Sequence, residues 1–205
     1  MEELRTVEKT ASAELTEKKS VFIGTASPVK TEAEARDFIA SVKKKYSDAR
    51  HNVSAYIIDG GIMHSSDDGE PSGTAGVPVL EVIKKCGITN VAVVVTRYFG
   101  GILLGAGGLV RAYSAAAKLA VDASNIVTYE KFFKCRIKCS YADYNDVIYR
   151  LSQFCTKLGK TEFGSDVTLD FSVWHGDREK CENEIISRFD SKYSVTVTGE
   201  KFDVK

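Results

Sequence analysis

Residues 67–113 read DDGEPSGTAGVPVLEVIKKCGITNVAVVVTRYFGGILLGAGGLVRAY, and this stretch decides the fold. An acidic, glycine-rich loop leads into a helical segment and then into an apolar run that ends at Arg97. A second glycine-rich loop follows and opens another helix, which carries Arg111. Nine of the 16 glycines lie between Gly69 and Gly108. Because glycine allows close backbone approach and positive φ angles, we expect any functional site here.

The hydrophobic pattern around this stretch predicts an α+β fold. Segments in which apolar residues recur every three to four positions alternate with short β-branched runs. Thr31 can begin one helix, because Glu34 completes a capping box three residues later. The valine-rich run before Arg97 lacks polar alternation, which is typical of a strand covered on both faces. For residues 1–125 we expect a mixed sheet with helices on one face, in the order ββαβ(β)αβα.

The pattern restarts after Asp122 and predicts a second domain over residues 130–205. Its predicted order, βαββαβ, is the ferredoxin-like arrangement. The expected elements are a strand (132–140), a helix (142–158), two strands (160–163 and 166–174), a helix (177–189) and a strand (194–202).

The composition is that of a soluble globular protein. Lys and Arg together number 28, as do Asp and Glu. The absence of a basic excess weighs against binding of duplex nucleic acid mainly through phosphate neutralisation, although it leaves room for a local basic patch. The start MEELRTVEK lacks an apolar targeting segment, and no apolar run approaches the roughly 20 residues of a membrane span. We therefore expect a cytoplasmic protein with no membrane partner.

The second glycine-rich loop does not match known phosphate-binding motifs. A P-loop requires Lys and Ser or Thr after its last glycine. Gly100 and Gly105 have the right spacing, but Ala106 and Gly107 stand in the next two positions. A dinucleotide fingerprint needs a further glycine where Val110 stands.

The second glycine-rich loop still leads into the start of a helix that is flanked by two arginines. The free backbone N–H groups at a helix start can bind an anion. An aromatic residue beside it can offer a stacking surface for a base. Alternatively, the glycines only permit tight turns and close packing. The candidate anion- or phosphate-binding residues are Arg97, Tyr98, Gly100, Gly101, Gly105, Gly107, Gly108 and Arg111.

The acidic loop contributes Asp67, Asp68 and Glu70. These carboxylates can coordinate a hard cation or form a general acid–base pair. However, the sequence Asp-Asp-Gly-Glu-Pro also favours a turn by itself. We expect them to pair with Arg97 and Arg111 across the loops. We expect no metal and no cofactor. No catalytic residue is assigned, because no nucleophile has an identifiable base.

The motifs also resemble a known family. The segments 67–80 and 95–113, together with KKSVFIG at 18–24 and DARHNVSAY at 48–56, are similar to the pattern of the YigZ/IMPACT family. The resemblance covers roughly the first 125 residues. It implies a first domain like the second domain of a small-subunit ribosomal protein, while the remainder fits the extra domain of the bacterial members.

The family includes a translational regulator, so the resemblance implies a role in translation. The first hypothesis is a non-enzymatic protein that binds RNA, the ribosome or a translation factor. The alternatives are an enzyme acting on a nucleotide or phosphorylated small molecule through the glycine-rich loop with Arg97 and Arg111, and a purely structural interaction protein. Leu103 stands where many relatives have Lys, which predicts that few phosphates are contacted.

Overall fold

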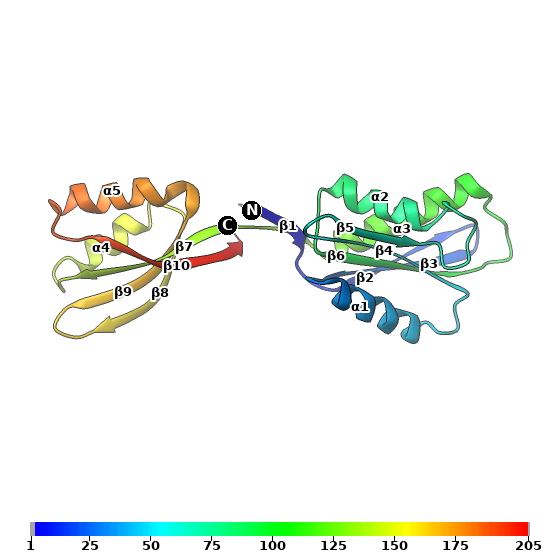
Figure 1. Cartoon of the computed structure of the whole chain (residues 1–205), viewed down its shortest axis with the longest axis horizontal. Coiled ribbons are helices and arrows are strands. Elements are labelled where there is room, and N and C mark those ends of the chain that lie inside the picture. The colour runs from blue at the N-terminus through cyan, green and yellow to red at the C-terminus, as the bar shows by residue number, and fades with distance from the viewer. Residues whose placement is uncertain (1–2, 205) are drawn as a thin grey trace. The chain divides into compact units, whose positions relative to one another are not determined.

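The computed structural model describes residues 3–204. They form two compact units: Leu4–Val127, and residues 128–204 together with Glu3. The α+β class predicted from the sequence is confirmed, with two sheets and five α-helices among the described residues (Figure 1). None of the helices in this part of the chain is long and apolar enough to cross a membrane.

The first unit is built on a five-stranded sheet in the order β2-β3-β6-β4-β5. Strand β1 lies outside this sheet. The elements are β1 (Glu3–Val7), β2 (Ala11–Glu17), β3 (Ser20–Pro28), α1 (Glu32–Lys45), β4 (His51–Ile58), β5 (Ile62–Ser66), α2 (Gly76–Cys86), β6 (Val91–Tyr98) and α3 (Ala106–Ala123).

Helices cover both faces of this sheet, so the expected placement on one face is wrong. Figure 1 shows α1 on one side and α2 and α3 on the other. The reason lies in β6, whose residues from Val91 to Arg97 are all buried. Val91, Val93 and Val95 belong to the cluster under α2 and α3, whereas Ala92 belongs to the cluster under α1. A strand that is apolar on both faces requires cover on both.

The sheet is antiparallel throughout rather than mixed. The connection through α1 does join two parallel strands, β3 and β4, as a helical crossover requires. However, β6 lies between them and pairs antiparallel with each. The parallel strands are therefore never neighbours.

Local sequence features fix the helices of this unit. The Thr31 hydroxyl accepts the Glu34 amide (3.2 Å), which confirms the predicted cap of α1. On the other face, α3 comes very close to β3 at Gly24. A Cβ at that position would lie 2.4 Å from the carbonyl oxygen of Ala116, so only glycine allows this approach.

The second unit has the strand order β10-β7-β9-β8, antiparallel throughout, with the predicted βαββαβ sequence of elements. Figure 1 shows α4 and α5 on the same side of its sheet. The elements are β7 (Ile126–Cys139), α4 (Tyr144–Leu151), β8 (Thr156–Phe163), β9 (Val167–Trp174), the short 3₁₀ helix η1 (His175–Asp177), α5 (Arg178–Arg188) and β10 (Val195–Val204).

Alternation along β7 and β9 gives this sheet one apolar and one polar face. Cys135, Ile137 and Leu169 point into the core with α4 and α5. Burial raises the pKa of the Cys135 thiol to about 11, so it stays protonated and packs as an apolar group. The intervening residues of β7, from Lys134 to Lys138, are exposed. The second sheet is thus covered by helices on one face only.

Helix α4 is shorter than predicted. It ends at Leu151, and β8 begins at Thr156, within the range expected to be helical. Leu151, Phe154 and Leu158 keep a helical spacing, but Leu158 is an exposed strand residue. The spacing alone could not distinguish the end of the helix from the strand that follows.

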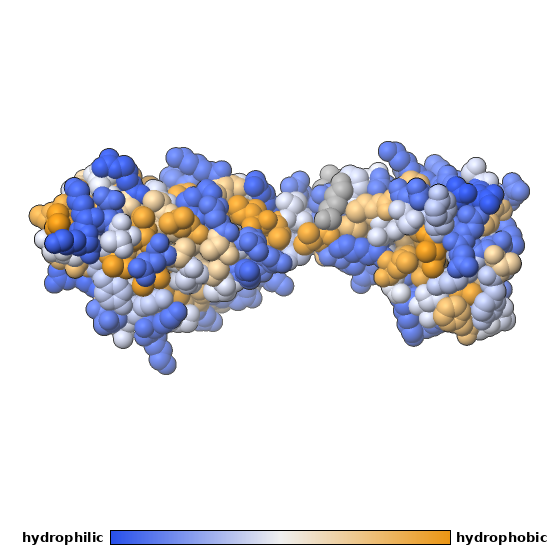
Figure 2. Space-filling model, turned by 180° about the vertical axis from the view of Figure 1, so that it is seen from behind, coloured by the Kyte–Doolittle hydropathy of each residue, from blue (hydrophilic) through white to orange (hydrophobic). Residues whose placement is uncertain are grey.

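On the face shown in Figure 2, hydrophobic residues form separate patches among hydrophilic ones on both units. Three exposed apolar side chains of the first unit belong to the loop after β6, namely Phe99, Ile102 and Leu103. Leu103 is 82% exposed. The second glycine-rich loop therefore projects apolar surface into solvent instead of joining the core.

Candidate functional site

The two loops of residues 67–113 are joined by a buried ion pair. Glu70 Oε1 lies 2.7 Å from Arg97 Nη1, and the two side chains are 3% and 8% exposed. The same oxygen accepts a hydrogen bond of 2.7 Å from the hydroxyl of Tyr113 on α3. Burial and the hydrogen bond to Glu70 both raise the pKa of Tyr113, which keeps the phenol neutral. Loop, strand and helix thus meet at one carboxylate.

Aromatic rings surround the buried guanidinium. Arg97 lies over the rings of Phe22 and Phe99, with its central carbon 5.5 and 5.6 Å from their centroids. Phe22 in turn packs edge-on against Tyr113. The Nε atom of Arg97 is buried without a hydrogen-bond partner among the described residues. Glu70 is therefore the group that compensates this buried charge.

Asp67 holds the acidic loop to the start of α2. Its Oδ1 accepts the amides of Gly76 (2.7 Å) and Ala75 (3.1 Å), and its Oδ2 accepts that of Gly73 (2.8 Å). Burial acts to raise the pKa of Asp67, but the three backbone donors outweigh it and the net shift is downward. The N-cap residue of α2, Ala75, makes no side-chain hydrogen bond to the helix. The carboxylate of Asp67, which lies outside the helix, therefore takes the place of an N-cap side chain.

Asp67→Asn is expected to lower the free energy of unfolding by about 1 kcal/mol, the usual value for loss of a helix cap. An amide cannot accept on both sides of the loop, so the Gly73 contact is lost. Since the folded-state pKa is depressed, the carboxylate stabilises the fold above its unfolded pKa, and this contribution disappears as pH falls through the folded value. Urea unfolding at neutral pH and at a pH below the ordinary aspartate pKa should show the larger difference between the proteins at neutral pH. An equal difference at both would contradict the assignment.

Asp68 fixes the same loop to β4 and α1. Its carboxylate lies 2.6 Å from Lys43 Nζ and accepts the Asn52 amide at 2.7 Å, while its backbone oxygen contacts His51 Nδ1 at 2.8 Å. Asp67 and Asp68 thus have partners other than the predicted arginines. Glu70 alone pairs with Arg97. In residues 3–204, no group of three or more His, Cys, Asp or Glu side chains is placed to hold a metal ion.

The glycines of the second loop have different structural roles. A Cβ on Gly100 would lie 2.0 Å from the backbone of Lys19, so the loop packs directly on the turn between β2 and β3. Gly101 and Gly105 have φ angles of 84° and 70°, which favour glycine. Gly108 meets the side chain of Leu104. Gly107 has open space around its Cα, apart from Arg111.

Arg111 lies in surroundings opposite to those of Arg97. It is exposed, and it lines a hollow of about 240 Å³ with Lys18, Glu17 and Gly108. Arg97 does not line this hollow. Tyr98 is also separate, since its hydroxyl donates to Asp48 Oδ1 (2.8 Å). The predicted residues therefore divide into a buried group around Arg97 and an exposed group around Arg111.

Sequence reasoning missed Tyr113 and Lys43, which complete the buried group and the loop contacts. Tyr113 lies at the end of residues 67–113, on a helix whose other residues are mostly small or apolar. A tyrosine on a buried helix face needs a partner for its hydroxyl, and that requirement was the available signal. Nothing in the sequence points to Lys43.

Comparison with known proteins matches this first unit to a family. The model of the Impact N-terminal domain matches residues 18–121, which include both loops, the Lys18–Lys19 turn and nearly all of α3. The chain belongs to the IMPACT family. The resemblance noted in the sequence is thereby confirmed.

Members of the IMPACT family are similar to this chain well beyond the matched domain. The family member YvyE of Bacillus subtilis is 39% identical over 98% of this chain and 89% of its own length. The family member YigZ of Escherichia coli is 33% identical over 74% of this chain and 76% of its own length. A solved structure titled as that of a hypothetical protein covers 96% of this chain and 98% of its own, with 27% identity and a TM-score of 0.61.

Proposed function

We propose that this IMPACT family protein is a non-enzymatic binding protein of the translation machinery, which contacts RNA phosphates through the exposed group around Arg111. The observation that carries the proposal is the contrast between the two arginines. Arg97 is neutralised by Glu70 in the interior. Arg111 is exposed beside Lys18, and within the described residues no carboxylate pairs with it.

The start of α3 adds to the positive character of this surface. Its N-cap, Gly105, has no side chain to accept the free amides, and the first turn contains no acidic residue. A helix start of this kind favours an anion, and an arginine over it adds a bidentate donor for phosphate. Glu17 also lines the hollow and lowers its net charge. The surface therefore suits a small number of phosphate contacts.

The buried group supports binding rather than catalysis. A nucleotide-processing site on the glycine-rich loop needs Arg97 and Arg111 on the same ligand. Instead, Arg97 and Glu70 neutralise each other, and Asp67 and Asp68 are occupied by backbone amides and Lys43. These residues hold the loops in position for a partner that binds outside.

The test is titration of labelled single-stranded RNA, read by fluorescence anisotropy at several salt concentrations. We expect modest affinity with a slope of log K against log salt of about −1.5 to −2, the value for two or three phosphate contacts. Arg111→Ala should weaken binding and reduce the size of the slope by about 0.7. Co-sedimentation with ribosomes should decrease in the same variant.

Lys118→Ala is the matched control. Lys118 is an exposed cation on the same helix, but it is paired with Asp122. It should leave the RNA affinity and the salt slope nearly unchanged. If the Arg111 and Lys118 substitutions have equal effects, RNA binds by general charge attraction, and the proposed surface is wrong.

A further inference from the structure

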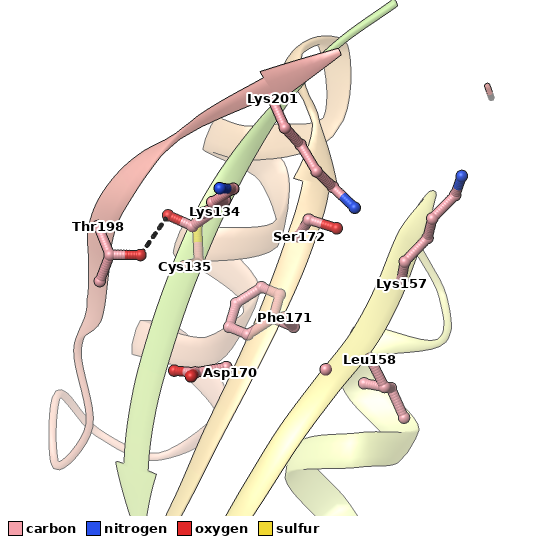
Figure 3. Close-up of a pocket in the computed structure, with 10 residues that line it drawn as sticks. Lys134, Cys135, Lys157, Leu158, Asp170, Phe171, Ser172, Thr198 and Lys201 are labelled. Carbon is pink, nitrogen blue, oxygen red and sulfur yellow. Dashed lines mark hydrogen bonds between the residues drawn. The ribbon is translucent and has the colours of Figure 1, made fainter. Parts of the chain in front are cut away.

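Three lysines from three strands meet on the face of the second sheet that α4 and α5 leave open. Lys134 of β7 and Lys157 of β8 lie directly opposite Ser172 of β9, one on each side. Lys201 of β10 pairs with Phe132, two residues before Lys134 on the same face. Figure 3 shows the three lysines around Ser172 on this open face. Like charges at neighbouring positions of one sheet face repel one another, so this arrangement is unfavourable by itself.

The lysines line a hollow of about 230 Å³, together with Ser172 and Thr198. Gly159 on β8 leaves room at its edge, since it lies against the backbone of Asp170 where β8 is irregular. The volume is below the 300–1,000 Å³ range of pockets for drug-sized ligands. It suits one small group and not a large apolar ligand.

Charge compensation within the hollow is incomplete. Lys157 (2.9 Å) and Lys201 (2.8 Å) share one carboxylate, that of Asp203. Lys201, followed by Lys157, lowers the pKa of Asp203 to about 2, so it stays ionised. Asp170 is held by Arg136 through two hydrogen bonds. Lys134 has no carboxylate partner in residues 3–204, so three ammonium groups and the Arg136 guanidinium share two carboxylates, those of Asp203 and Asp170.

Ser172 provides a second, independent observation. The residue is only 5% exposed, and Figure 3 shows its hydroxyl directed toward the lysine side chains. Thr198, by contrast, donates to the backbone oxygen of Lys134. No hydrogen bond of the Ser172 hydroxyl is found within the described part of the chain. A hydroxyl that has no protein partner, belongs to a largely buried residue and is directed into a cationic hollow is suited to donate to an anion.

We propose that this face is a binding site for a phosphate group, held by Lys134, Lys157, Lys201 and Ser172. A phosphate has several oxygens and up to two charges, which match several ammonium donors and one hydroxyl. Lysine binds phosphate as a point charge and can approach it from several directions, whereas planar carboxylates are best matched by the arginine fork. The phosphate belongs either to an RNA backbone or to a free phosphorylated compound.

This site does not depend on the proposed function. It lies in the second unit and shares no residue with the surface around Arg111. Substitutions in one unit therefore test one proposal and leave the other intact.

The experiment uses ¹⁵N-labelled full-length protein at low salt, titrated with inorganic phosphate and followed through the amide signals of Lys134 and Ser172. Wild type should show saturable shifts. The double variant Lys134→Gln with Lys201→Gln should bind at least about tenfold more weakly, the effect expected for loss of a single charge-assisted contact. Shifts that never saturate in wild type, or an unchanged affinity in the double variant, would overturn the proposal.

Lys138→Gln is the matched control, because Lys138 is exposed on the same strand and face but is paired with Asp166. It should bind phosphate as wild type does. Ser172→Ala is a second variant that leaves every charge in place. It should weaken binding severalfold and so tests the site even where the double variant does not fold. If Ser172→Ala binds phosphate with full affinity, the hydroxyl does not contact the ligand, and its proposed role is wrong.

Two arms identify the source of the phosphate. Short single-stranded RNA is titrated into the Arg111→Ala protein, so that the first unit contributes little. If RNA shifts Ser172 at concentrations far below those of inorganic phosphate, the ligand is a nucleic-acid backbone. If only inorganic phosphate does so, the ligand is a free phosphorylated compound. Either result supports the site, and a response to neither contradicts it.

Discussion

Glu70→Gln is expected to lower the free energy of unfolding of the first unit by about 3–5 kcal/mol, the range for breaking a buried ion pair by removing one partner. The Gln amide fills the space of the carboxylate but leaves the Arg97 guanidinium without a counter-charge. That guanidinium is 8% exposed and already has one nitrogen without a partner among the described residues. Tyr113 loses its charged acceptor in the same step.

The measurement must report on the first unit alone. Hydrogen exchange of the α3 amides does so, because α3 lies wholly within that unit. The single tryptophan, Trp174, lies in the second unit. The urea midpoint of unfolding measured by its fluorescence should therefore be the same in the variant as in wild type. A loss below about 1 kcal/mol would show that Arg97 reaches water after the substitution.

Glu81→Gln is the control for this prediction. Glu81 and Lys84 form an ion pair of 2.9 Å in the same unit, but their side chains are 46% and 42% exposed. An exposed pair contributes about 0–1 kcal/mol. The contrast between the two substitutions therefore measures the effect of burial and not of the ion pair as such.

A fully apolar replacement separates the ion pair from the space it fills. The triple variant Glu70→Leu, Arg97→Met and Tyr113→Phe removes every charged or polar member of the group together. Buried ion pairs can often be replaced by apolar residues at little cost. We expect this variant to regain most of the stability that Glu70→Gln loses. If it is less stable than Glu70→Gln, the group serves packing that apolar side chains cannot reproduce.

The sequence was sufficient to predict that Arg97 needs a partner, because the apolar run before it requires burial and a buried guanidinium requires a counter-charge. It was not sufficient to predict which acid. Asp67, Asp68 and Glu70 lie within four residues, and their directions depend on the turn. Asp68 has a φ of 45°, a backbone conformation that the sequence does not specify. This geometry directs Asp68 toward Lys43 and leaves Glu70 for Arg97.

The sequence also left undetermined which strands are neighbours. The burial of β6 on both faces could be read from its valines, but its position between β3 and β4 depends on contacts distant in sequence. The hollow on the second sheet illustrates the same limit. Alternation places Lys134 on a polar face, yet its meeting with Lys157 and Lys201 requires the register of three strand pairs.

Gly100→Ala is expected to destabilise the first unit by about 2–3 kcal/mol, in the upper range for overpacking. The new Cβ would lie 2.0 Å from the carbonyl group of Lys19 and 2.4 Å from the amide nitrogen of Ser20. These are backbone atoms, so no side-chain rotation relieves the clash, and the loop must leave the turn. The hydrogen bond from the Gly100 amide to the Ser20 hydroxyl is lost with it.

Gly101→Ala is the matched control for this clash. Its φ of 84° is unfavourable for alanine, but no atom lies within 4 Å of the added Cβ. We expect a loss of about 1 kcal/mol from backbone strain alone. Hydrogen exchange of α3 compares the two variants, and RNA titration follows their effect on binding. Because Lys18 belongs to the turn that Gly100 contacts, only Gly100→Ala should also weaken RNA binding. If the two variants lose the same free energy of unfolding, the loop can leave the Lys18–Lys19 turn without further loss of stability. The contact at Gly100 would then not hold the exposed group around Arg111 in place.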